Sequence, residues 1–127
     1  MPRIRSIEAR LAVADVGRSA AFFADVLSFE IRSLWPEGAP EFAILERDGA
    51  RVQLARGRSP DPGGRASGTL WIYVEDLAAL HAQVKARVPI EWGPAVYFYG
   101  RRELGFRDPD GNLVILSEVA TGPAGQG

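Results

Sequence analysis

The chain contains an internal repeat, and this feature most narrows the folds it can adopt. The first half begins with EARLAVADV and the second with TLWIYVEDL. In each, a stretch with the alternating pattern of a β-strand ends in Val-x-Asp, and a helical pattern follows it. The halves close with RDGARVQLA and DPDGNLVILS, in which an Asp-Gly turn leads into another alternating stretch. Asp15 and Asp76 lie 61 positions apart, and Gly49 and Gly111 lie 62 apart. This nearly constant offset indicates two copies of one module.

Each half is expected to fold as β-α-β-β-β. Asp15 and Asp76 stand where a helix begins, because a carboxylate there accepts hydrogen bonds from the first backbone amides. Apolar residues follow at helical spacing, namely Val16, Ala20, Phe23 and Leu27 in the first half and Leu77, Leu80, Val84 and Val88 in the second. Short alternating patterns then predict strands over residues 29–34, 41–46, 51–55, 90–92, 102–107 and 112–118.

A segment rich in Pro, Gly and polar residues, RSPDPGGRAS, separates the two halves and is typical of a linker. We therefore predict a first module over residues 1–57, a linker over 58–67, a second module over 68–119 and a flexible tail over 120–127. The two modules together are expected to form one domain.

Composition excludes several classes of function. The chain has 127 residues, of which 46% are hydrophobic and 24% charged, an ordinary balance for one globular domain. Its formal net charge of −1 gives no field that would attract nucleic acid. The absence of cysteine excludes disulfides, thiolate metal sites and a cysteine nucleophile. No stretch has the pattern of a signal peptide or membrane span, so we expect a cytoplasmic protein with neither nucleic acid nor membrane as partner.

Three segments carry a family resemblance. These are VADVGRSAAFFADVLSFEI (13–31), VEDLAALHAQVKARV (74–88) and GFRDPDGNLVILSE (105–118). They resemble the first-module signature, the second-module helix and the closing hairpin of the glyoxalase/bleomycin-resistance protein/dioxygenase (vicinal oxygen chelate) superfamily, and most closely its bleomycin-resistance-like members without metal. The resemblance covers residues 7–118. It implies an α+β fold of two tandem βαβββ modules, with curved sheets around a cup and helices on the outer face.

The alternation of side chains along a strand predicts which residues face this cup. On the first strand Ala9, Leu11 and Val13 are expected beneath the helix, and on the strand after the linker Leu70, Ile72 and Val74. The side chains expected in the cup are then Glu8, Arg10, Ala12, Gln53, Thr69, Trp71, Tyr73, Glu103, Gly105, Arg107 and Ile115. The same reasoning assigns Phe42, Ile44, Leu104 and Phe106 to the core.

The resemblance also implies where a metal would bind. In metal-dependent relatives each module supplies one ligand from its first strand and one from its last, and the matching positions are Glu8, Gln53, Thr69 and Ile115. A divalent metal needs three or four His or carboxylate donors, and only Glu8 is one. The single histidine, His81, is expected on the second helix and away from the cup. We therefore predict no metal and no cofactor, and no Ser-His-Asp arrangement.

The expected cup suits a flat, partly cationic ligand. Trp71 and Tyr73 offer ring faces for stacking, and Glu8 and Glu103 supply negative charge. The segment GPAVYFYGR (93–101), interpreted as a loop that moves over the cup, adds Tyr97 and Tyr99.

We predict a non-catalytic small-molecule-binding protein that sequesters a planar antibiotic or metabolite, and a homodimer because relatives of this length usually pair. Three alternatives remain open. One is a metal-dependent lyase or dioxygenase, and another is a metal-free enzyme that uses Glu8 or Glu103 as acid or base. In the third, Trp71 and Tyr73 only fill a collapsed interior. Arg10 and Arg107 also face inward in this interpretation and would neutralise the glutamates.

Overall fold

The computed structural model describes residues 1–57 and 68–120, and the repeated β-α-β-β-β order is confirmed. The elements of the first module are β1 (Ala9–Val13), α1 (Val16–Leu27), β2 (Glu30–Trp35), β3 (Phe42–Arg47) and β4 (Ala50–Arg56). Those of the second are β5 (Thr69–Tyr73), α2 (Leu77–Lys85), β6 (Trp92–Tyr97), β7 (Arg101–Arg107) and β8 (Leu113–Val119). The predicted linker, 58–67, and residues 121–127 of the predicted tail lie outside the described residues.

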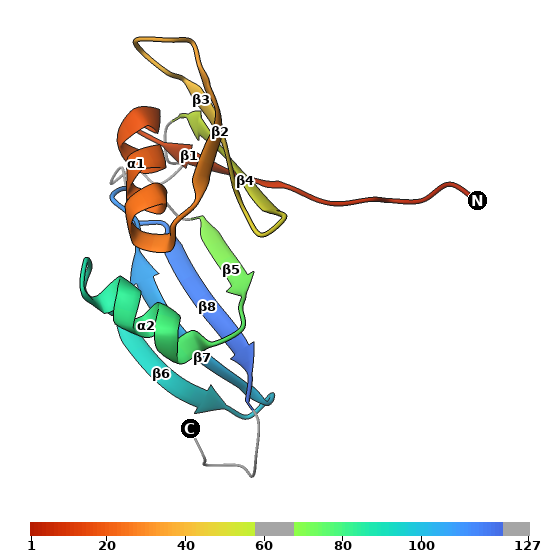
Figure 1. Ribbon diagram of the computed structural model, residues 1–127, viewed down its shortest axis with the longest axis vertical. Coiled ribbons are helices and arrows are strands. Elements are labelled where there is room, and N and C mark those ends of the chain that lie inside the picture. Colours follow the sequence, from red (N-terminus) through yellow and green to blue (C-terminus); the bar gives the residue numbers. More distant parts are fainter. Residues whose placement is uncertain (58–67, 121–127) are drawn as a thin grey trace.

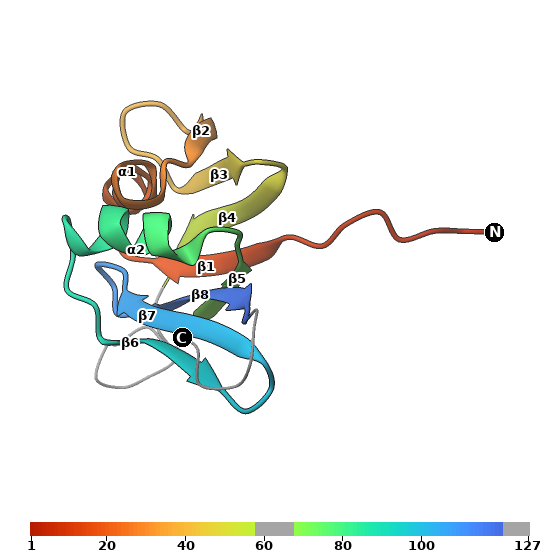
Figure 2. The same cartoon turned by 60° about the horizontal axis from the view of Figure 1, so that its bottom comes forward.

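Each module builds its own four-stranded sheet (Figure 1). The strand orders are β1-β4-β3-β2 and β5-β8-β7-β6, in which the first and last strands of a module pair in parallel and the other pairs are antiparallel. Each helix packs on one face of its own sheet, and the two helices contact each other (Figure 2). Within the described residues no strand of one sheet pairs with the other, so the two sheets do not close on each other. One face of each sheet is left without a helix.

Both helices begin at the predicted residues. Asp15 accepts a hydrogen bond from the amide of Arg18 at 3.0 Å, and Asp76 accepts one from the amide of Ala79 at 3.2 Å. The apolar stripe of α1 is fully buried, whereas that of α2 is buried only at Leu77 and Val84, with Leu80 and Val88 partly covered. The second helix therefore leaves part of its sheet open.

The predicted core is right on most strands but wrong on β3. Ala43 and Leu45 are buried beneath α1, while Phe42 and Ile44 lie on the opposite face, paired with Ala55 and Gln53. The four consecutive apolar residues of this strand do not alternate with polar ones, so the pattern could not decide which pair is buried. Alternation assigned Phe42 and Ile44 to the core, but α1 packs on the other face of β3, the face of Ala43 and Leu45. Ala9, at the start of β1, is also exposed rather than buried.

The segment 93–101 is not the loop that the sequence suggested. Most of it belongs to β6, which pairs with β7 and contains an irregularity between Trp92 and Ala95. Gly93 and Pro94 fall within this irregularity, and proline is tolerated there because β6 is an edge strand. Only residues 98–100 of the segment predicted to be a loop form a turn outside the strands.

A turn of the second module holds the helix of the first. Asp110, in the Asp-Pro-Asp-Gly-Asn turn between β7 and β8, accepts hydrogen bonds from the amide of Ala14 at 3.0 Å and from the hydroxyl of Ser19 at 3.2 Å. Asp108 organises this turn by accepting bonds from the amides of Asp110 and Asn112, and its burial raises the pKa of its carboxyl. The turn therefore couples the two modules through α1.

Candidate functional site

Three residues of the first module that the sequence predicted to face the cup, Glu8, Arg10 and Gln53, are linked by hydrogen bonds. Gln53 accepts a hydrogen bond from Arg10 Nε at 3.0 Å and donates one to Glu8 Oε2 at 2.9 Å. Glu8 Oε1 also pairs with Arg51 at 3.2 Å, and the guanidinium carbon of Arg10 lies 5.4 Å from the centre of the Phe42 ring. The carboxylate of Glu8 therefore already has two partners on this face.

The four positions that correspond to metal ligands do not fit a divalent metal. Glu8 and Gln53 are hydrogen-bonded to each other, Thr69 is an exposed hydroxyl at the start of β5, and Ile115 is apolar and buried. Across residues 1–57 and 68–120, no group of three or more His, Cys, Asp or Glu side chains comes together in a way that could hold a metal ion. The side chains at these four positions therefore do not form the donor set that a catalytic metal requires.

The face of the second sheet that α2 does not cover carries most of the other predicted residues. Strand register aligns Trp71, Ile115, Gly105 and Trp92 in one row, and Tyr73, Ser117, Glu103 and Ala95 in the next. The ring of Trp92 lies on Gly105 so closely that a Cβ at that glycine would be 2.4 Å from it. Trp71 and Tyr73 are exposed on the same face.

Five aromatic side chains, Trp71, Tyr73, Trp92, Tyr97 and Tyr99, are brought together by the second module, and we call them the aromatic face. Tyr97 packs edge-on against Trp92 with ring centres 6.0 Å apart, and it stacks on Tyr99 at 5.8 Å with 12° between the ring planes. The guanidinium carbon of Arg101 lies 4.6 Å from the centre of the Tyr73 ring, and its Nε donates to Ser117 Oγ. The guanidinium of Arg101 therefore already covers one side of the Tyr73 ring in a cation–π contact.

Glu103 is a buried carboxylate beneath these rings. Its side chain is 2% exposed, its Oε1 accepts a hydrogen bond from the hydroxyl of Tyr99, and its Oε2 is buried without a hydrogen-bond partner in the described part of the chain. Within the same residues no arginine or lysine forms an ion pair with it. A buried carboxylate with an unused oxygen is costly, and it marks a place that a hydrogen-bond donor would stabilise.

Tyr99 reports on the state of this carboxylate. The hydrogen bond to Glu103, followed by desolvation and by the negative charge of Glu103, raises the pKa of the Tyr99 phenol to about 12. The bond stabilises the neutral phenol, and removing the negative charge of its acceptor relieves that effect.

We therefore expect Tyr99 to stay protonated at pH 11 in the wild type, and its pKa to fall toward 10 in the Glu103→Gln variant. The measurement is an NMR titration of protein labelled at the tyrosine Cζ carbons, with Tyr99→Phe used to assign the resonance. Ionisation of Tyr99 near pH 10 in the wild type would show that the hydrogen bond does not persist in solution.

The remaining predicted residues lie apart from this group. Arg107 is exposed at the end of β7, where Glu91 accepts two hydrogen bonds from it at 2.8 and 3.2 Å and raises the pKa of its guanidinium. It does not neutralise Glu103, contrary to the sequence-based expectation. His81 is partly exposed on α2. No hydrogen bond or ion pair within the described residues joins the Glu8, Arg10 and Gln53 group to the aromatic face.

Three residues of the site were missed by the sequence analysis: Trp92, Arg101 and Ser117. Parity along β8 would have placed Ser117 beside Ile115, because the two are two residues apart on one strand. Trp92 could not have been predicted, since its position over Gly105 depends on the irregularity in β6.

The structure has no helix long and apolar enough to span a membrane within its described part.

Comparisons with known proteins agree with this architecture. The family described as "Glyoxalase/Bleomycin resistance protein/Dioxygenase superfamily" matches residues 3–116. TioX from Micromonospora sp. ML1 aligns with a TM-score of 0.79 at 21% identity, covering 91% of this chain and 98% of that one. A lactoylglutathione lyase from Agrobacterium tumefaciens aligns with a TM-score of 0.73 at 20% identity, covering 92% and 95%. None of the curated proteins matches the chain significantly. At these identities the solved structures are similar in fold.

Proposed function

The chain belongs to the glyoxalase/bleomycin resistance protein/dioxygenase superfamily, and from that premise we propose that it binds a planar, cation-bearing small molecule on the aromatic face of its second module without transforming it. The ligand is an antibiotic or a metabolite of that chemistry. A relative of the same fold from Catenulispora acidiphila is described as a glyoxalase/bleomycin resistance protein. Sequestration of such a compound is the role we propose for this chain.

The observation that carries the proposal is the unpaired charge of Glu103. A carboxylate that is 2% exposed and has no ion-pair partner in the described residues gives the overlying rings a negative potential. Aromatic faces attract cations and stack on flat rings, so the two features favour the same kind of ligand. By contrast, Glu8 of the first module is already paired with Arg51 and Gln53.

The exposed rings define where the flat part of the ligand would lie. Tyr73 is 70% exposed, and Arg101 covers only one of its faces, so the other face is open for stacking. Trp71 lies two residues earlier on the same face of β5. The Tyr99 hydroxyl occupies only Oε1 of Glu103, so a ligand that donates a hydrogen bond to this carboxylate would use Oε2.

The test is a panel of planar compounds, charged and neutral, screened by thermal shift and then by tryptophan fluorescence. Bound ligands raise the melting temperature by mass action. Trp71→Phe is expected to weaken a stacked ligand by about 1 kcal/mol, a several-fold loss of affinity. Glu103→Gln is expected to weaken a cationic ligand and leave its neutral analogue nearly unchanged.

Controls separate binding from folding. Trp35, exposed on the first module, is the matched position, and Trp35→Phe is expected to change neither affinity nor stability. The proposal fails if no planar compound raises the melting temperature and Trp71→Ala strongly destabilises the protein, because Trp71 then only fills the interior.

A second candidate function rests on the same pair of residues. Buried Glu103 accepts a hydrogen bond from the partly exposed Tyr99, and a desolvated carboxylate of this kind is what a metal-free acid or base uses. This alternative would give turnover of a bound compound, with a pH-rate profile that is lost in Glu103→Gln. A metal-dependent lyase or dioxygenase would instead carry about one equivalent of tightly bound metal.

We also propose that the protein is a homodimer. Both β1 and β5 are edge strands, and the faces of the sheets that carry the predicted site residues have no helix on them. Unprotected edges and apolar faces of this kind favour association with a second chain.

A further inference from the structure

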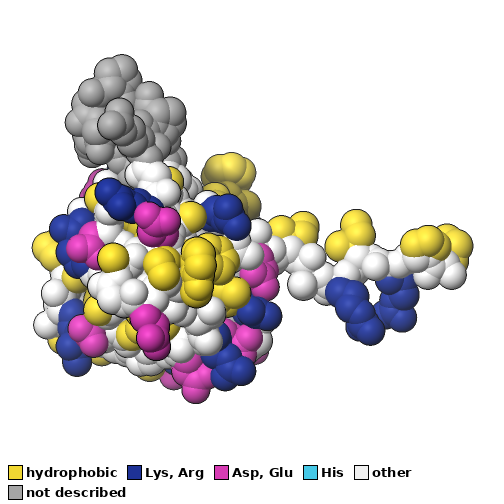
Figure 3. All heavy atoms as spheres, turned by 90° about the horizontal axis from the view of Figure 1, so that it is seen from above, with side chains coloured by type: hydrophobic (Ala, Val, Ile, Leu, Met, Phe, Trp, Pro, Cys, Tyr) yellow, Lys and Arg dark blue, Asp and Glu magenta, His cyan; other side chains and the backbone are white. Residues whose placement is uncertain are grey.

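Arg101 of β7 carries a positive charge that has no acidic partner within the described residues. Figure 3 shows basic and acidic side chains next to one another around the body of the molecule, and Arg102, the next residue along β7, pairs with Glu118 at 2.6 Å. Arg101 is partly buried, so its guanidinium has lost part of its hydration without gaining a carboxylate. An anion that reached it would accept a charge-assisted hydrogen bond.

Three contacts fix the position of this guanidinium. Its Nε donates a hydrogen bond to the hydroxyl of Ser117, its Nη2 donates one to the backbone carbonyl of Ser117 at 3.1 Å, and its carbon lies 4.6 Å from the centre of the Tyr73 ring. The two hydrogen bonds use two of the five N–H groups of the guanidinium and leave the others for an anion. Because the side chain is already ordered, binding an anion costs it little further conformational entropy.

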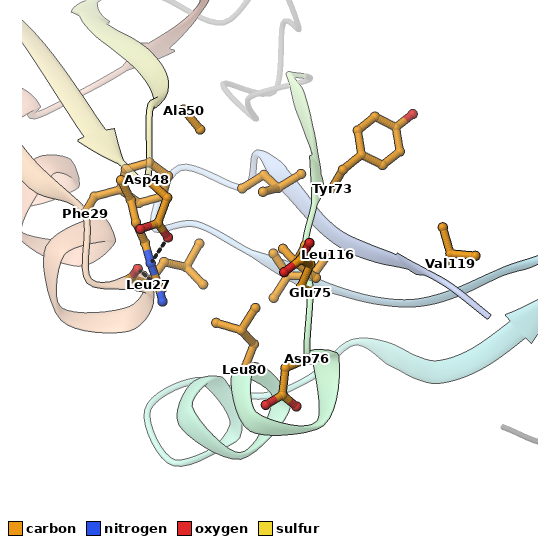
Figure 4. Close-up of a pocket in the computed structure, with 13 residues that line it drawn as sticks. Leu27, Phe29, Asp48, Ala50, Tyr73, Glu75, Asp76, Leu80, Leu116 and Val119 are labelled. Atoms are coloured by element: carbon orange, nitrogen blue, oxygen red, sulfur yellow. Dashed lines mark hydrogen bonds and ion pairs between the residues drawn. The ribbon is translucent and has the colours of Figure 1, made fainter. Parts of the chain in front are cut away.

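Arg101 and Glu103 present opposite charges on the same face of the second sheet. They are two residues apart on β7, so their side chains point to the same side and their Cα atoms are about 7 Å apart. The Tyr73 ring, on which the guanidinium lies, points away from Leu80 and Leu116, which are on the side of the sheet that α2 covers (Figure 4). The two charges form no ion pair with each other, because the guanidinium is held against Tyr73.

A ligand with a positive charge alone satisfies only one of these two groups. Its cation would be attracted by the buried carboxylate of Glu103 and repelled by the guanidinium of Arg101. A ligand that also carries an anion replaces this repulsion with an attraction. Among the described residues Oε2 of Glu103 has no hydrogen-bond partner and Arg101 has N–H groups to spare, so the face offers an acceptor and a donor to one compound.

We propose that the compound bound on the aromatic face is a planar zwitterion, with an ammonium group at one end and a carboxylate at the other, and this inference rests on the binding function proposed above. The ammonium donates to Oε2 of Glu103, and the carboxylate accepts from the free N–H groups of Arg101. The ring between them stacks on the exposed side chains of Trp71 and Tyr73. Ser117 is a positioning residue, because it holds the guanidinium where the carboxylate arrives.

The test compares para-(aminomethyl)benzoate, which carries both charges on one flat ring, with its methyl ester, which carries only the ammonium. Dissociation constants come from NMR titrations of isotope-labelled protein, in which the Nε–H resonance of Arg101 reports directly on the carboxylate. We expect the acid to bind about ten-fold more tightly than the ester and to shift this resonance strongly, which the ester does not. In Arg101→Gln this preference is expected to disappear, while the ester binds at least as well as before.

Two variants serve as controls. Arg107→Gln also removes a positive charge from β7, but Glu91 already pairs with Arg107, so the preference for the acid is expected to remain about ten-fold. Ser117→Ala keeps the charge of Arg101 and removes the hydroxyl that fixes it. We expect this variant to reduce the preference about three-fold without changing the affinity for the ester.

The outcomes separate this inference from the proposed function. Equal affinities of the wild type for the acid and the ester would overturn the zwitterion and leave the proposed binding of cations intact. A preference for the acid that persists in Arg101→Gln would overturn it as well. If neither compound bound the wild type, and no other cation of the panel did, the proposed function itself would fail. The comparison of acid and ester uses the wild type, so it decides the matter even if Arg101→Gln does not fold.

Discussion

The Gly93→Ala variant is expected to lose about 3–5 kcal/mol of unfolding free energy. Gly93 has a φ of +81°, which costs any residue with a Cβ about 1–2 kcal/mol. A Cβ there would also lie 2.3 Å from the carbonyl oxygen of Glu103 and 2.9 Å from Leu104 Cα. These are backbone atoms of β7, so the clash is relieved only if the two strands separate. Urea denaturation followed by circular dichroism measures the loss.

Gly100 provides the matched control. Its φ is +82°, it lies in the same β6–β7 hairpin, and nothing lies within 4 Å of the position of its Cβ. Gly100→Ala therefore carries the backbone cost without the clash, and we expect a loss of about 1–2 kcal/mol. Equal losses in the two variants would mean that β6 does not approach β7 as closely as described. Because Glu103 is the residue that Gly93 contacts, Gly93→Ala is also expected to lower ligand affinity.

Phe23→Ala is expected to cost about 3–5 kcal/mol, which is a large part of the total stability of a domain of this size. Phe23 is fully buried between α1 and its sheet, with ring centres 5.3 Å from Phe22 and 6.2 Å from Phe29 in edge-to-face geometry. Truncation removes these contacts and leaves a cavity that the rigid sheet cannot close. The midpoint of urea denaturation is the measurement.

Phe98→Ala is the control for the loss of a phenyl ring. Phe98 is almost wholly exposed in the β6–β7 turn and contacts only the edge of Tyr99 among the described aromatic residues. We expect its truncation to change stability by about 1 kcal/mol or less. If Phe23→Ala were equally mild, the first module would have to repack around the space, and the description of its core would be wrong.

The architecture could be predicted from the sequence because its signals are local or repeated. Asp15 and Asp76 marked the helix starts through the chemistry of capping, and the offset between the halves indicated the duplicated topology. The placement of Trp71 and Tyr73 on one face of β5, opposite buried Leu70, followed from the period of two along the strand. Each of these inferences needs only a short stretch of chain.

The wrong predictions concern residues whose position depends on contacts between two elements of the fold. Along β3 both faces are apolar, so the choice between Phe42 and Ala43 depends on what α1 packs against it. The irregularity in β6 exists only in relation to β7, and it decides that Trp92 covers Gly105. The pairing of Arg107 with Glu91 rather than Glu103 likewise joins strand and loop across the rim. Periodicity within one strand contains no information about these contacts.

The bond between Asp110 and α1 has a consequence for the order of events during protein synthesis. All strand pairs of the first sheet involve residues up to Arg56, so that sheet can form before the second half has been translated. The amide of Ala14 and the hydroxyl of Ser19, however, donate to Asp110, which lies 96 and 91 positions further along the chain. Neither hydrogen bond can form before Asp110 has been synthesised. Until the ribosome has released that turn, the nascent first module lacks these two hydrogen bonds and the contacts of α1 with α2, and it is at this stage that a chaperone or a protease would find it most accessible.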